Sequence, residues 1–174
     1  MGVVSAFTII RALSFFHITL AFFFLTNPKI IADQNVVFLL GESMQLPTPR
    51  DFNKPSAATA FIALLFAFLA ISDLTSLSMS EEVAESYWGT QTPVRLVFLF
   101  AVTGYTYIFK EGGAFAERGQ HSFQSGDDLK NSIVFTWGFL ELATWFWVFV
   151  TLRDERRQRA VRLIEKRKAE HNTL

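Results

Sequence analysis

Residues 136–149 read TWGFLELATWFWVF, with three tryptophans and three phenylalanines around one carboxylate, Glu141. They lie inside an apolar segment, 132–152, that is long enough to cross the roughly 30 Å hydrocarbon core of a bilayer as a helix. A charged group at that depth costs about 2.5–3.5 kcal/mol on insertion scales, so Glu141 needs a reason to be there. The alternatives are a buried helix of a soluble protein and a glutamate that faces water.

Composition favours the membrane. Of 174 residues, 51% are hydrophobic and 16% aromatic, while only 18% are charged. A soluble domain of this size needs more polar surface than that. The formal net charge of zero says nothing about nucleic acid or acidic partners, for which the distribution of charge along the chain matters. The lack of cysteine excludes disulfides and thiolate metal sites.

Three further segments are long and apolar. The first ends at Asn27-Pro28, because proline disfavours helix in the residue before it. The next two begin beside Pro55 and at Pro93, because proline is favourable in the first turn of a helix. In no segment do apolar and polar residues alternate strictly, which argues against the strands of a membrane β-barrel. The sequence therefore predicts an all-α integral membrane protein whose domain, 1–152, is a four-transmembrane-helix bundle. The predicted spans are about 3–26, 56–77, 93–109 and 132–152.

A cleaved signal peptide is the other interpretation of the first span. The segment lacks a basic region at its start and a small-x-small site before Asn27, and its apolar run is too long. We therefore expect it to remain in the membrane. Between the first two spans, VVFLL at 36–40 predicts a short helix at the interface or against the bundle. Residues 111–130, rich in glycine, serine and charge, predict a flexible loop.

The tail, 153–174, has eight Lys/Arg against four Asp/Glu. It is either a solvated helical extension or a basic surface for anionic headgroups or RNA. Its basic residues favour the cytosolic side, and four spans then place both termini there. The 77–93 connection, which has no basic residue, supports this orientation only partly. The candidate basic surface comprises Arg153, Arg156, Arg157, Arg159 and Arg162.

Three charged residues fall in the predicted cytosolic leaflet. At about 1.5 Å per residue, Asp73 and Arg95 lie at similar depths, roughly 6 Å from the surface, and Arg11 lies roughly 12 Å deep. An ion pair of Asp73 with Arg95 or Arg11 is the simplest way to satisfy them.

Glu141 and His17 fall near the midplane, at roughly 16 Å and 21 Å from the same face. They can meet if the first and last spans are neighbours. Glu141 is then a protonated structural group bonded to His17, Thr144, Tyr105 or a carbonyl, a contact for another subunit, or part of an ion or proton pathway. The third span offers little polar lining for a pathway.

No pattern of enzyme chemistry occurs. The sequence lacks metal-ligand spacing, a glycine-rich phosphate loop and a nucleophile elbow, and its histidines stand at 17, 121 and 171 in unrelated segments. We expect no catalytic residue, no cofactor and no metal.

Several motifs resemble the fungal increased-loss-of-mitochondrial-DNA family: FFHITLAFFFLTNPKII, LLGESMQLP, SDLTSLS, TPVRLVFLFAVTGYTYIF and the final aromatic helix leaving through LRDERRQR. The resemblance covers the chain to about residue 160 and lies in the order of features. It departs in the glycine-rich loop at 111–130 and the short basic tail. It implies a four-span endoplasmic reticulum protein with an indirect link to mitochondrial genome maintenance, and carries over no catalytic residue. A potassium channel role has been proposed in the family, but VTGYTY is not a selectivity filter.

The sequence predicts a non-enzymatic accessory subunit or assembly factor of a larger membrane complex, for example of protein biogenesis, translocation or glycosylation machinery. Its expected partners are integral membrane proteins of the endoplasmic reticulum and phospholipids, with no specific nucleic acid. The alternatives are a small cation channel or transporter using Glu141 and His17, and a lipid-binding module that places the tail and Arg95 on anionic headgroups.

Overall fold

A computed structural model describes residues 4–110 and 126–172, and all regular structure in these ranges is helical. This confirms the all-α prediction. The long helices are α1 (Ala6–Thr26), α4 (Ala57–Ser76), α5 (Glu81–Ile108) and α7 (Ser132–Asn172). The short elements are α2 (Lys29–Ala32), α3 (Asn35–Ser43) and the 3-10 turns η1 (Arg50–Asn53) and η2 (Asp127–Leu129).

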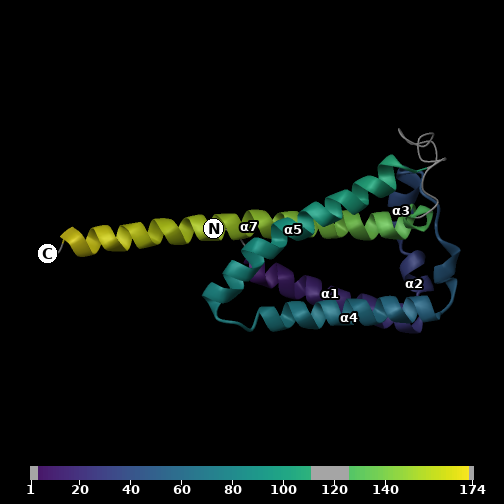
Figure 1. Cartoon of the computed structure of the whole chain (residues 1–174), viewed down its shortest axis with the longest axis horizontal. Helices are drawn as coiled ribbons and strands as arrows, with labels where there is room; N and C mark the ends of the chain where they lie inside the picture. The colour runs from purple at the N-terminus through teal and green to yellow at the C-terminus, as the bar shows by residue number, and fades with distance from the viewer. Residues whose placement is uncertain (1–3, 111–125, 173–174) are drawn as a thin grey trace.

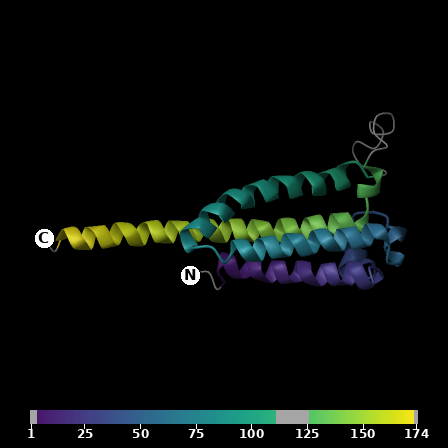
Figure 2. The same cartoon turned by 60° about the horizontal axis from the view of Figure 1, so that its bottom comes forward.

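Three helices, α1, α4 and α7, are long and apolar enough to cross a membrane. They coincide with the first, second and fourth predicted spans. The third predicted span, 93–109, lies in α5, which is not among these three. Its start also differs from the prediction, because α5 begins at Glu81 and continues through Pro93. Proline lacks the amide donor and crowds the preceding turn, so it bends a helix, and α5 is visibly curved (Figure 2).

The four long helices form two pairs. α1 packs along α4, and α5 packs along α7, while α1 and α7 make a smaller contact that joins the pairs. Figure 1 shows α2 and α3 at the end of the bundle opposite the C-terminal tail. At the tail end, the Ala6 amide donates to Glu155 Oε1 over 3.1 Å, which places the start of α1 beside α7. The negative carboxylate also suits the positive end of the α1 dipole.

The short helix α3 lies against α7, which confirms the expectation of a short helix packed on the bundle. The contact is close because Gly41 has no side chain: a Cβ there would lie 2.6 Å from the Cβ of Ser132. The Ser132 amide also donates to the Pro47 carbonyl over 2.9 Å. The connection between α1 and α4 is therefore tied to the start of α7.

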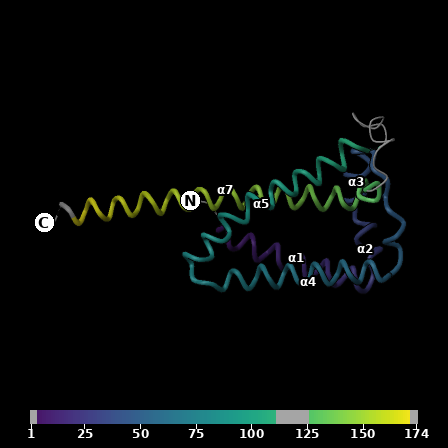
Figure 3. Tube along the Cα trace, in the orientation of Figure 1, coloured from purple at the N-terminus to yellow at the C-terminus, as the bar shows by residue number. Residues whose placement is uncertain are grey.

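α7 continues unbroken into the tail, as the tube in Figure 3 shows. This confirms the helical extension predicted for the tail. Its side chains at 160–170 are all exposed, and we call residues 160–172 the arm. The expected flexible loop falls mostly on residues 111–125, which lie outside the described ranges.

Candidate functional site

Glu141 and His17 meet in the interior, as the depth argument predicted. His17 Nε2 lies 2.6 Å from Glu141 Oε1, and Trp145 Nε1 donates to Glu141 Oε2 over 2.9 Å. His17 is 0% exposed and Glu141 4%. Thr144 instead donates to the Leu140 carbonyl. Both carboxylate oxygens thus have partners within the chain, and Glu141 needs no group from another subunit to satisfy it.

Asp73 and Arg95 form the predicted ion pair. The guanidinium donates through Nη1 to Oδ2 over 2.8 Å and through Nη2 to Oδ1 over 2.6 Å, a two-bond geometry that only arginine supplies. The Arg95 guanidinium also lies 5.1 Å and 4.5 Å from the ring centroids of Trp88 and Trp145. Arg95 is therefore engaged inside the bundle. Arg11, the other candidate, is exposed on α1 and forms no ion pair with the described residues.

The basic tail residues divide into two groups. Arg159 pairs with Glu81 over 2.6 Å and with Glu85, and Arg156 lies 3.3 Å from Glu85. These two arginines hold the start of α5 against α7. Within the described chain, the exposed Arg153, Arg157 and Arg162 enter no ion pair. Sequence reasoning missed the Glu81–Glu85 partners because it assigned 81–92 to a connection; the i,i+4 spacing of the two glutamates was the available signal.

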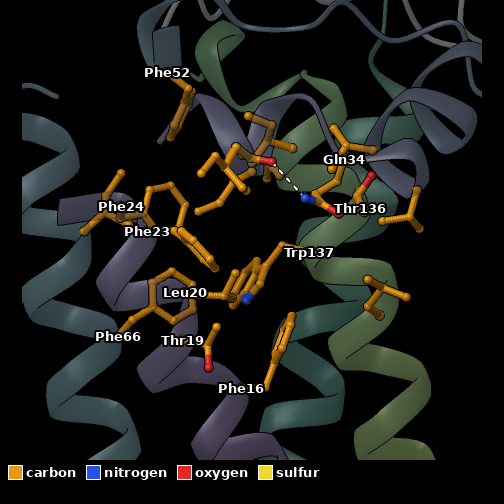
Figure 4. A pocket seen from close by; sticks show the side chains of 18 of the residues that line it. Phe16, Thr19, Leu20, Phe23, Phe24, Gln34, Phe52, Phe66, Thr136 and Trp137 are labelled. Carbon is orange, nitrogen blue, oxygen red and sulfur yellow. Dashed lines mark hydrogen bonds between the residues drawn. The ribbon is translucent and has the colours of Figure 1, made fainter. Parts of the chain in front are cut away.

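A pocket of about 520 Å³ lies between the α1–α4 pair and α7, and α2 and α3 also contribute to its lining. Figure 4 shows its aromatic wall, which includes Phe24 and Phe66 from α1 and α4 and Trp137 from α7. Glu141 and Thr136 also line it. The polar residues of the third predicted span are not part of its lining. The sequence did not predict this pocket, because phenylalanines in the first two spans supply its wall but do not by themselves indicate a cavity.

The described residues contain no group of three or more histidines, aspartates and glutamates arranged to hold a metal. What the interior offers is two buried hydrogen-bonded pairs, linked by Trp145, beside an apolar pocket. This chemistry suits binding and packing.

Comparison with known proteins agrees with the resemblance in the motifs. The family model described as increased loss of mitochondrial DNA protein 1 matches residues 4–162. The chain is 31% identical over 134 residues to protein ilm1 of Schizosaccharomyces pombe, covering 76% of this chain and 71% of that one. It is 27% identical over 148 residues to protein ILM1 of Saccharomyces cerevisiae, covering 85% of this chain and 64% of that one. No solved structure matches. The chain belongs to the increased loss of mitochondrial DNA protein 1 family.

Proposed function

We propose that this chain is a four-span endoplasmic reticulum membrane protein with both termini in the cytosol. In this proposal it is a non-enzymatic accessory subunit or assembly factor of a larger membrane complex, and its link to mitochondrial genome maintenance, taken from the family name, is indirect. Biogenesis, translocation or glycosylation machinery is the kind of complex to test first.

The arm carries the proposal. α7 extends beyond the bundle as an exposed helix on which Val161, Leu163 and Ile164 are 47%, 59% and 54% exposed. Val161 and Ile164 are three positions apart and share a face. A solvated helix needs no such residues, whereas an amphipathic helix binds a groove on a partner through them. The exposure of Arg153 and Arg157, nearer the bundle, supports a contact of the tail with anionic headgroups.

The crossing of the membrane by α5 is supported by its outer surface. Val97 and Phe100 are 71% and 70% exposed, as residues that face lipid are. Arg95, which precedes them on the same helix, is neutralised by its ion pair with Asp73. The pair removes the main obstacle to insertion, since an unpaired charge is the costly state.

Purification in mild detergent tests the subunit proposal. The full chain should bring down stoichiometric membrane partners, and a variant with Val161, Leu163 and Ile164 changed to serine should lose them. The matched control changes Arg162 and Glu165 to glutamine on the same helix and should retain them. Recovery of the full chain as a lone monodisperse monomer would contradict the proposal, and so would full retention of partners by the serine variant.

A further inference from the structure

Arg11 stands on the outer face of α1, in a helix that is long and apolar enough to cross a membrane. Its side chain is exposed, and within the described chain it has neither an ion pair nor a hydrogen bond. An unpaired charge inside a membrane span is the costly state. The guanidinium therefore needs an anion that this part of the chain does not supply.

Three carboxylates at the tail end of the bundle are already engaged. Each binds a group other than Arg11, and they are Asp73, Glu85 and Glu155. Arg95, the other arginine considered for anionic headgroups, is held inside the bundle by Asp73. Arg11 is thus the arginine of the first three long helices that faces outward with its charge uncompensated by the described residues.

The depth of Arg11 decides between a lipid phosphate and a carboxylate on another membrane helix. A hydrocarbon core of roughly 30 Å takes about 20 helical residues, and counted back from Thr26 these reach Phe7. The Cα of Arg11 then lies roughly 6 Å inside the core. Side chains on a helix tilt toward its N-terminus, and a long arginine side chain can snorkel, so the guanidinium reaches the phosphate layer. A lipid phosphate is therefore sufficient to pair with it.

The residues deeper on the same face suit acyl chains. Phe15, Ile18 and Phe22 follow Arg11 at intervals of four, three and four residues, which places all of them on one side of the helix. Their side chains are 60%, 39% and 60% exposed. Contacts between membrane helices favour small residues that let the backbones approach closely. This bulky ridge offers lipid an apolar surface instead.

We propose that Arg11 binds the phosphate of an anionic phospholipid in the leaflet on the tail side, with an acyl chain of that lipid along Phe15 and Phe22. A zwitterionic lipid brings its own cation next to the phosphate, so an arginine without a neighbouring carboxylate selects an anionic lipid. The proposal rests on the crossing of the membrane by α1, which is part of the proposed function.

Native mass spectrometry of the full chain measures this binding. Delipidated protein in mild detergent is titrated with phosphatidylserine and, separately, with phosphatidylcholine. We expect tighter binding of phosphatidylserine, and Arg11→Gln should weaken it by about 10-fold, the factor that a hydrogen bond to a charged group supplies. Arg11→Lys keeps the positive charge without the two-bond geometry and should bind with intermediate affinity.

Two controls make this test specific. Arg167→Gln removes the same charge from the exposed arm and should bind phosphatidylserine as the unsubstituted chain does. The melting temperature of Arg11→Gln should be unchanged, because no described residue bonds to Arg11. Equal affinity of the unsubstituted chain for the two lipids would overturn the proposal, and so would undiminished binding of phosphatidylserine by Arg11→Gln.

Photolabelling in phosphatidylcholine nanodiscs locates the lipid. A phosphatidylserine with a photoreactive acyl chain should crosslink to residues 15–22, with competition by unlabelled phosphatidylserine. Crosslinks spread evenly over the outer faces of α4 and α5, or a membrane protein crosslinked to α1 in place of lipid, would overturn the proposal.

Alkaline carbonate extraction of microsomes tests the embedding of the chain separately. Release of the chain would overturn the proposed function together with this inference. Loss of lipid selectivity in a chain that stays in the membrane would overturn this inference alone.

Discussion

Trp145 joins the two buried polar pairs. Its indole nitrogen donates to Glu141 Oε2, while its ring lies against the Arg95 guanidinium and stacks on Trp88 with the ring centroids 5.5 Å apart. A flat ring with one donor can serve both pairs because the donor and the π face point in different directions. Asp73–Arg95 and His17–Glu141 are thereby parts of one interior, and a change in either is expected to affect the other.

Glu141→Leu should destabilise the protein, because it leaves His17 and Trp145 without their acceptor inside the bundle. Each orphaned group costs about 1–3 kcal/mol. Glu141→Gln keeps an amide oxygen that can accept a hydrogen bond from His17 or Trp145, so this variant should lose less stability. Thermal unfolding in detergent, with Glu165→Leu on the exposed arm as the control, measures both. An unfolding midpoint for Glu141→Leu equal to that of the unsubstituted chain would refute this role.

At the scale of elements, sequence reasoning located α1, α4 and α7 within a few residues, because each is a long apolar run with a clear stop or start. From depth it predicted an ion pair of Asp73 with Arg95 or Arg11, and a contact of Glu141 with His17 on the condition that the first and last spans are neighbours. It misplaced the start of α5 because proline usually opens a helix; here Trp88 is fully buried against Trp145, and that packing carries the helix past Pro93. The pocket was beyond prediction, since it depends on how two helix pairs are spaced.

The seam between α3 and α7 gives a test at the same scale. Gly41→Ala should destabilise the chain by about 1–3 kcal/mol, because the new methyl group would meet the Ser132 Cβ, which no rotamer change can move. Gly104→Ala is the matched control, since a Cβ there meets nothing within 4 Å, and it should be neutral or stabilising by up to about 1 kcal/mol. The unfolding midpoint should fall for Gly41→Ala and stay unchanged or rise for Gly104→Ala; equal shifts would show that the seam is not tight.

For the whole molecule, the arrangement of helices puts the start of α1, the turn after α4 and the tail at one end of the bundle (Figure 1). The connection through η1 and the turn η2 are at the other. If all four long helices cross the membrane, these two sets of sites face opposite compartments. If α5 does not cross, the tail moves to the side opposite the start of α1.

Cysteine labelling distinguishes these topologies, because the natural chain has no cysteine. An impermeant maleimide should label Ser5→Cys, Ser78→Cys and Lys166→Cys from one side of sealed microsomes. Thr48→Cys and Asp128→Cys should react only after permeabilisation. Labelling of Asp128→Cys together with Ser78→Cys, and of Lys166→Cys from the other side, would establish three crossings instead of four.

The unbroken course of α7 makes it a stiff rod. Between Gly138 and the end of the helix at Asn172 there is neither proline nor glycine, so the rod has no hinge. Glu141 and Val161 lie on it roughly 30 Å apart. A displacement of the arm by a bound partner would therefore be transmitted along α7 to the Glu141–His17 contact.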